Sequence, residues 1–444
     1  LKTQDPVADN LQVGIEAMQA GKEFNKGTYN HNIRLLAKYP GFTPSSMKIE
    51  TIAEEFIEFA VDNLLWLFNQ VPAEIRDRSH LWYAGARKTI TRLSEQHDVS
   101  DQAVAAVMAG LSPQKDWYQN ASLGERLINI HTKFTTGNQV AWMPDRKMID
   151  TARRIFGSKK HKEMRLAVIK VPYADLTEAT EKAMWLRIYD EAYNPRGYAK
   201  LTPEGDWVGQ AEGKVAWGSL VEISKGISAL TDPSLENLTK IMGERNKIRN
   251  FYNNLLAPES ALGDVTIDTH AVAAALLRAL SGSSNEVSHN FASAPPKAKQ
   301  PKGFVAAKAD RNTGAHGTYG VFAEAYRRAA EQVGILPREM QSITWEAVRG
   351  LFSAKFKAQK PNVAKIDNLW KKYENGTLSL KGVRDQILVE VDGITDPTWF
   401  NLGDTDDAKV RNTSYDGELA GVRVPRRPTG RVAERGGDTS GVRY

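Results

Sequence analysis

The chain has 444 residues, a hydrophobic fraction of 41% and a formal net charge of +6. This is enough apolar material for two or three domains, or for one large core with appendages. Because there is no cysteine, disulfides, cysteine-ligated metal sites and iron–sulfur clusters are excluded, and a reducing compartment fits the composition. No apolar run has the length needed to cross a bilayer, and residues 1–6 do not resemble a signal peptide. The mildly basic balance favours polyanionic partners.

Apolar residues at helical spacing predict a mostly α protein. Residues 1–45 are a polar arm with one short helix at 9–19, and residues 48–68 form an amphipathic helix. A later helix, which starts near Asp101, ends at Ser112 because the residue before a proline is pushed out of the α region. Further helices are expected at 79–95, 123–134, 146–156, 177–193, 215–230, 235–241, 319–333, 337–356, 363–374 and 379–389.

The segments between these helices contain few strand signals. Strands are expected only at 167–171 and 264–267. Residues 202–213 carry glycine and proline, and we interpret them as a loop inserted near the functional site. The basic run around Lys159 and Lys160 fits either a solvated surface or a loop that contacts phosphate.

The stretch 112–120 bunches polar side chains around two aromatic residues. Enzymes that act on a nucleic-acid base extrude it, stack it on aromatic rings and read its polar edge. Gln114, Trp117 and Asn120 have the chemistry of such a base pocket. The same residues also fit an ordinary helix start with Trp117 in the core, and the sequence leaves both interpretations open.

A carboxylate and a hydroxyl precede an alanine-rich helix in the stretch 241–280. A glycine turn opens a basic helix at 243–256, a loop follows, and the run 264–267 delivers Asp268 to the first turn of a second helix. Asp268 can simply cap that helix by accepting hydrogen bonds from its first amides. It also suits a site for a phosphate backbone and a developing positive charge on a sugar, because cations lie upstream at Arg245, Lys247 and Arg249.

The order of a glycine turn, Lys247, a helix, a loop and Val-Thr-Ile-Asp-Thr-His resembles the helix-hairpin-helix DNA glycosylase superfamily. The resemblance implies a bilobed, mostly α body with a helix-hairpin-helix element, few short strands and an active cleft between the lobes. By position, Asp268 matches the catalytic aspartate, and Lys247 matches the lysine with which some members form a Schiff base. The hairpin here keeps one of the family's two glycines. Contacts with DNA phosphate are expected from Gly243, Arg245, Arg249, Lys159 and Lys160.

A second, wider resemblance spans residues 80–352 and concerns uncharacterised phage and bacterial proteins that are glycosylase-like and linked to DNA base hypermodification. It implies an enzyme acting on a flipped base, by N-glycosidic cleavage or by group transfer onto an activated pyrimidine. It also implies a location in the cytoplasm of a bacterial host or in a phage virion. The segments that carry it are 108–117 with Asn120, 247–254, 268–270 and 341–346.

Composition shifts at Ser281, after which the chain is rich in serine, alanine, proline, lysine and glycine. The last 35 residues are rich in glycine, arginine and proline. We expect this tail to be disordered when free and to contact phosphate, or phage virion or replication proteins. The expected organisation is an arm at 1–45, a glycosylase-like core at 46–280, a basic linker at 281–318, helices returning to the core at 319–360, and C-terminal helices with the basic tail at 361–444.

Two classes of function remain open from the sequence. The first is a DNA-acting enzyme that uses Asp268 and Lys247. The second is a non-catalytic DNA-binding or virion-associated protein with the same fold, which the basic linker and tail support. No cofactor and no metal are expected, because His289 and His316 are isolated from other metal-ligating residues.

Overall fold

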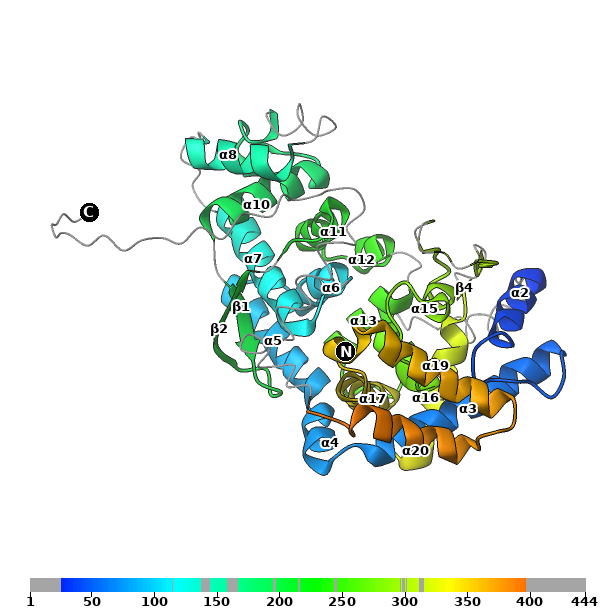
Figure 1. Ribbon diagram of the computed structural model, residues 1–444. Helices are drawn as coiled ribbons and strands as arrows, with labels where there is room; N and C mark the ends of the chain where they lie inside the picture. The colour runs from blue at the N-terminus through cyan, green and yellow to red at the C-terminus, as the bar shows by residue number, and fades with distance from the viewer. Residues whose placement is uncertain are drawn as a thin grey trace, which may run out of the picture.

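The computed structural model describes residues 25–113, 115–136, 144–157, 167–194, 197–214, 216–242, 246–295, 297, 300, 302–310 and 315–396. The protein is mostly helical, as the sequence predicts (Figure 1). Its helices form two lobes, each built around its own hydrophobic core. Strands in the described ranges are limited to two small two-stranded sheets. Within those same ranges, no helix combines the length and the apolar character needed to cross a membrane.

The first lobe consists of α5 (Trp82–His97), α6 (Asp101–Leu111), α7 (Trp117–Thr136), α8 (Arg146–Ile155), η2 (Tyr173–Asp175), α10 (Ala179–Tyr193), α11 (Leu220–Thr231), α12 (Leu235–Met242) and α13 (Asn246–Leu256). Helix α6 lies at its centre, since its small and branched apolar residues are buried on every side. Ser100 caps α6 by accepting a hydrogen bond from Ala103 N at 3.2 Å. Glycine allows α11 to approach α7 closely: a Cβ atom at Gly226 would lie 2.8 Å from Leu127 Cδ1.

A β-hairpin packs against α5. Strand β1 (Gly197–Leu201) pairs antiparallel with β2 (Trp207–Lys214). A Cβ atom at Gly85 would lie 2.0 Å from the carbonyl oxygen of Pro203, so the turn of the hairpin rests directly on the backbone of the helix. The expected loop at 202–213 therefore belongs largely to this hairpin. The expected strand at 167–171 is wrong, because these residues form a helical turn.

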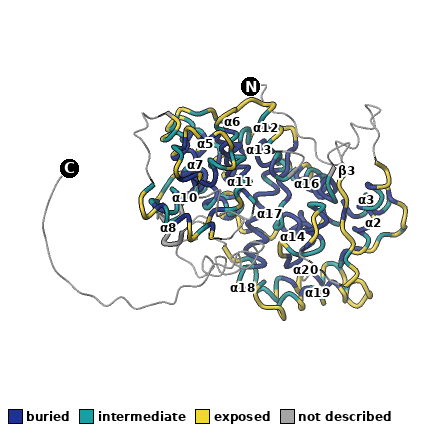
Figure 2. Tube along the Cα trace, turned by 90° about the horizontal axis from the view of Figure 1, so that it is seen from above, coloured by how far each residue is buried: buried dark blue, intermediate teal, exposed yellow. Residues whose placement is uncertain are grey.

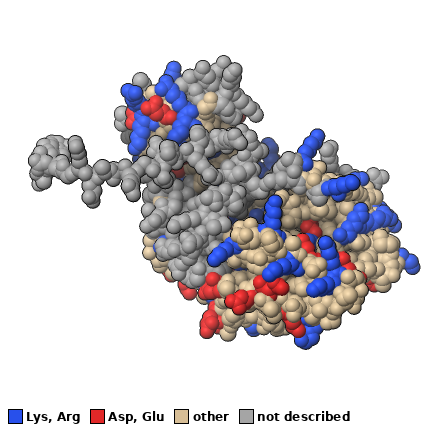
Figure 3. Space-filling view, in the orientation of Figure 1, with Lys and Arg blue, Asp and Glu red and all other residues tan. Residues whose placement is uncertain are grey.

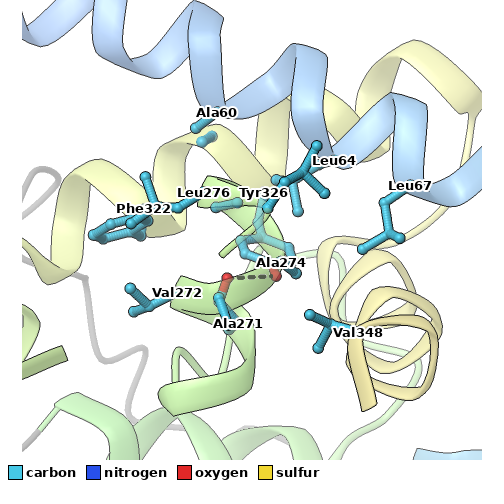
Figure 4. Packing of buried hydrophobic residues seen from close by; sticks show 14 of the residues in the cluster. Ala60, Leu64, Leu67, Ala271, Val272, Ala274, Leu276, Phe322, Tyr326 and Val348 are labelled. Atoms are coloured by element: carbon cyan, nitrogen blue, oxygen red, sulfur yellow. Dashed lines mark hydrogen bonds between the residues drawn. The ribbon is translucent and has the colours of Figure 1, made fainter. Parts of the chain in front are cut away.

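The second lobe consists of α2 (Lys26–Leu36), α3 (Ile49–Gln70), α4 (Ala73–His80), α14 (Thr269–Leu276), α15 (Asn285–Asn290), α16 (Tyr319–Val333), α17 (Pro337–Leu351), α18 (Ala354–Lys357), α19 (Lys360–Glu374) and α20 (Leu380–Val391). Helix α14 is its centre, and Figure 4 shows α14 enclosed by α3, α16 and α17. The Tyr326 hydroxyl donates a hydrogen bond to Ala271 O at 3.1 Å. A helix this rich in alanine can be surrounded closely, because its side chains occupy little space.

The described part of the segment 281–318 packs on the second lobe. It contains α15 and a two-residue ladder in which β3 (Ala309–Asp310) pairs with β4 (Ala315–His316). His289 is buried, with Nδ1 at 3.1 Å from the Tyr39 hydroxyl and Nε2 at 2.8 Å from Val305 O. Both ring nitrogens of His289 therefore have hydrogen-bond partners inside the fold.

The two lobes meet where α4, α5, α13 and α17 pack together. Figure 2 shows α13, α14 and α17 in the middle of the molecule. Arg78 of α4 forms ion pairs with Glu346 of α17 and with Asp396. The pair with Glu346 is nearly buried and ties the end of α4 to the helix that borders both cores.

Candidate functional site

An extended segment carries Asp268 to the start of α14. It lies in no sheet of the described structure, so side chains satisfy its backbone groups instead. The Tyr319 hydroxyl donates to Val265 O at 2.7 Å and accepts from Ile267 N at 3.0 Å. The expected strand at 264–267 is therefore wrong: the segment pairs with no described strand, and a buried tyrosine holds its backbone from the side.

Three asparagines of α13 face the same segment. They come from the sequence Asn-Phe-Tyr-Asn-Asn, whose spacing places them on the side of the helix that approaches α14. The asparagines thus fix the position of the residues that lead to Asp268. The hydrogen bonds run from Val265 N to Asn250 Oδ1 (3.3 Å), from Asn253 Nδ2 to Asp264 Oδ1 (3.1 Å) and from Asn254 Nδ2 to Thr266 Oγ1 (3.2 Å).

Asp268 and His270 form a pair at the N-terminus of α14. Asp268 Oδ1 caps the helix by accepting a hydrogen bond from Ala271 N at 2.8 Å, while Oδ2 lies 3.5 Å from His270 Nδ1. Trp345 of α17 packs edge-on against the His270 ring, with 5.9 Å between ring centroids. The side chains of Asp268 and His270 are 21% and 26% exposed, so the carboxylate that caps the helix is also partly accessible to solvent.

The electrostatics of the pair favour a carboxylate beside a neutral imidazole. Burial raises the pKa of Asp268, but the hydrogen bond and charge of His270, together with the charge of Lys247, lower it to about 2. Burial lowers the pKa of His270; Asp268 opposes this shift, and the charges of Lys357 and Arg349 add to it. At neutral pH an anion therefore faces an uncharged ring whose Nδ1–H can point at it.

The site lies at the junction of the lobes. Asp268 opens a helix of the second lobe, whereas Lys247 and Arg249 come from α13 of the first lobe, where both are half-buried. Trp345 packs with the core of the first lobe although α17 belongs to the second. The charge of Lys247 lowers the pKa of Asp268, so the amine lies within electrostatic range of the carboxylate.

An aromatic group borders this pair and consists of Trp82, Trp117, Phe251 and Trp345. The ring centroid of Trp82 lies 5.4 Å from that of Trp117, 6.1 Å from that of Phe251 and 6.2 Å from that of Trp345. Each member is only 5–8% exposed. Trp117, expected in a base pocket, is thus a core side chain that also belongs to the aromatic group in contact with His270.

Arg349 connects α17 to the start of α7. Its Nη1 lies 3.2 Å from Asp116 Oδ1, and its guanidinium carbon lies 4.3 Å from the centre of the Trp345 ring. The Arg349 side chain is 4% exposed. The cation therefore fixes the indole that packs on His270. The sequence offers no signal for this contact, because Asp116 and Arg349 are far apart along the chain.

The other residues expected in the site have different surroundings. Asn120 is buried, and its Nδ2 donates to Met108 O at 2.8 Å, which ties α7 to α6. The Tyr83 hydroxyl lies within hydrogen-bond distance of Gln341 Oε1 (2.9 Å) and Thr266 Oγ1 (3.2 Å), so Gln341 supports the segment before Asp268. The predictions for five residues outside the described ranges remain predictions: Gln114, Lys159, Lys160, Gly243 and Arg245.

The chemistry available here is that of an anion, an amine and a weak base. A carboxylate can stabilise a developing positive charge or accept a proton from water, and a lysine amine can attack an electrophilic carbon. Among the described residues, no three histidine, aspartate or glutamate side chains are grouped so that they could hold a metal ion.

Comparison with known proteins gives a match to a family model over part of the chain. Residues 46–178 and 302–352 are similar to a family of unknown function (DUF7178). The matched ranges contain Trp82, Trp117, Trp345 and Arg349 but not Lys247, Asp268 or His270. No curated protein and no solved structure matches the chain. The similarity thus covers the aromatic side of the site and assigns no activity to it.

Proposed function

We propose that the protein is an enzyme that acts on a base in DNA, most directly by cleaving an N-glycosidic bond. The observation that carries this proposal is Asp268, a partly exposed carboxylate kept ionised at the junction of the lobes. The electrostatic influence of Lys247 on Asp268 and the adjacent aromatic group support it. The resemblance of the chain order to helix-hairpin-helix glycosylases supports it as well.

In this proposal, Asp268 acts on the sugar. When the glycosidic bond breaks, its electron pair leaves with the base and a positive charge develops on the sugar ring. The Asp268 anion stabilises that charge and then accepts a proton from the water that attacks the sugar carbon. His270 holds the carboxylate through Nδ1–H and leaves its net charge intact because the ring is neutral.

Lys247 provides a second route to the same bond. Its amine can attack the sugar carbon and form a Schiff base with the abasic sugar, which borohydride reduces to a stable adduct. We expect trapping on abasic DNA to give a covalent adduct with the parent protein. The adduct should be lost in Lys247→Ala and kept in Lys240→Ala, a control at an exposed lysine of α12. Equal trapping in both variants would remove Lys247 from this role.

Group transfer is a related reaction for the same residues. On an activated hydroxymethyl pyrimidine, Asp268 would act as a general base that removes a proton from an attacking amine. The resemblance to phage proteins of DNA hypermodification supports this variant, and a bacterial host cell or a virion would then be the setting.

Mass spectrometry distinguishes these reactions. DNA with natural or hypermodified pyrimidines is incubated with the protein, and both released bases and digested nucleosides are measured. A freed base with matching abasic sites supports cleavage, and a mass gain on a nucleoside in the presence of an amine donor supports transfer. Unchanged DNA on every substrate, combined with tight salt-dependent binding, would favour a non-catalytic DNA-binding or virion-associated protein.

A further inference from the structure

Two basic segments that are distant in the sequence lie side by side in the second lobe. Residues 302–310 run along α2 and are held there by hydrogen bonds between side chains of α2 and their main chain. The Asn32 side chain accepts from Lys308 N at 2.8 Å and donates to Lys308 O at 2.9 Å. His31 Nε2 lies 2.9 Å from Ala306 O. These hydrogen bonds use main-chain atoms of 302–310, so they hold the segment against α2 without involving its lysine side chains.

The exposed charged side chains on these two segments are cationic. On α2 and the turn after it, Lys26, Arg34 and Lys38 are spaced by multiples of four residues, so they follow one side of the helix. Lys302 and Lys308 add two further exposed cations from the neighbouring segment. We call these five residues the basic face. Figure 3 shows lysine and arginine side chains gathered over the region of α2.

The basic face lacks neighbouring acids within its own segments. Residues 25–49 contain no aspartate or glutamate. The single carboxylate of 302–310, Asp310, is buried and accepts a hydrogen bond from Asn25 N at 3.1 Å. None of the five cations has a carboxylate partner among the described residues. On α19 and α20, by contrast, two of the exposed lysines form ion pairs, Lys365 with Glu390 (2.9 Å) and Lys381 with Asp385 (2.6 Å).

We propose that the basic face binds the phosphodiester backbone of a nucleic acid. Exposed cations held on a fixed backbone suit a chain of phosphates, because they can contact it without rearrangement of the fold. A lipid surface would require apolar anchors beside the cations, and the exposed large apolar side chain on this segment is Val305 alone among the described residues of 302–310. The inference rests on the proposed function in one respect: it takes DNA as the polyanion that binds.

The test is the salt dependence of DNA binding by the full chain. The test variant replaces Lys38, Lys302 and Lys308 by alanine, and the control replaces the exposed lysines Lys360, Lys371 and Lys372 of α19. Because the contacts of Lys308 with Asn32 use backbone atoms, truncating its side chain preserves them. Each lost phosphate contact should reduce the slope of log affinity against log salt by about 0.9.

We expect the test variant to lose roughly 3 units of slope and at least about tenfold in affinity at moderate salt, with little change in the control. Equal slopes in the two variants would overturn the inference, as would a parent protein that does not bind DNA at low salt. Loss of self-association instead of DNA binding would assign the face to a second copy of the chain. Asp268→Asn should keep the parental slope, so a failure of catalysis leaves this result independent.

Discussion

Asp264 and Asp268 lie four positions apart on one segment, and their surroundings shift their pKa values in opposite directions. Asp268 is partly exposed and faces His270 and Lys247, which lower its pKa to about 2. Asp264 is buried; burial raises its pKa to about 6, against the hydrogen bond from Asn253 and the charge of Arg338. Asp268 therefore stabilises the folded state above pH 4 and loses this contribution as the pH falls through 2, whereas ionised Asp264 destabilises it.

Replacing Asp264 by asparagine should stabilise the protein at high pH. The folded-state pKa of Asp264 lies above its unfolded value of about 3.9, so ionisation costs folding free energy that is fully present above pH 6. At 1.36 kcal/mol per pKa unit, the gain in Asp264→Asn is roughly 3 kcal/mol or less at pH 8, and it disappears near pH 4. Denaturant titrations at both pH values measure it. A variant that is less stable at pH 8 would show that Asp264 is needed as a charge.

Arg349 should add to the effect of burial on the ionisation of His270. Its charge lowers the pKa of His270, and its guanidinium holds Trp345 against that ring. We expect Arg349→Gln to raise the pKa of His270, as followed by NMR of the imidazole carbon protons. Replacing the exposed Lys355 by glutamine is the matched control. A pKa that stays the same or falls in Arg349→Gln would contradict this coupling.

At the scale of elements, the hairpin β1–β2 depends on the absence of a side chain in α5. The turn of the hairpin approaches Gly85 so closely that a Cβ atom there meets the Pro203 carbonyl oxygen at 2.0 Å. Gly110 of α6 is also helical, but its Cβ position has its nearest neighbour at 3.6 Å. Comparing the two glycines therefore distinguishes the steric effect of an added methyl group from its effect on helix propensity.

Gly85→Ala should reduce the free energy of unfolding by about 1–3 kcal/mol, because backbone must move to admit the methyl group. Gly110→Ala should be neutral or stabilising by up to about 1 kcal/mol, since alanine favours the helix and meets ordinary contacts. Thermal and denaturant unfolding of both variants checks the difference. Similar effects at the two positions would mean that the hairpin does not rest on α5 in solution.

Periodic elements were predictable from the sequence, and contacts between distant residues were not. Most helices follow from apolar spacing, and the end of α6 follows from Pro113. Helix α2 was not expected, because residues 1–45 were interpreted as a polar arm, whereas Ile33, Leu36 and Tyr39 belong to the core of the second lobe. The hairpin was not recognised because its strands contain glycine and lack clear alternation of polar and apolar residues. The cap at Asp268 could be predicted from the neighbouring residues in the sequence. The contact of Asp116 with Arg349 could not, because it depends on how the lobes pack.

At the scale of the whole molecule, the junction of two cores explains why residues from α7, α13, α14 and α17 meet. Each lobe can bury its own apolar residues, so the polar and partly exposed groups collect where the cores adjoin. There the charge of Lys247 from one lobe lowers the pKa of Asp268 from the other. The basic face lies on α2 and residues 302–310, which are not among the helices that meet at this junction. It would add further contacts with a long polyanion.

The most direct test of the central claim compares two aspartates that cap helices in the same way. Asp268 accepts from Ala271 N, and Asp145 accepts from Met148 N at the start of α8, both at 2.8 Å. Asparagine preserves a cap, so Asp268→Asn and Asp145→Asn should both fold. On the DNA substrate that the parent protein changes, we expect Asp268→Asn to lose activity by roughly a thousandfold or more and Asp145→Asn to keep it. Full activity in folded Asp268→Asn would contradict the account.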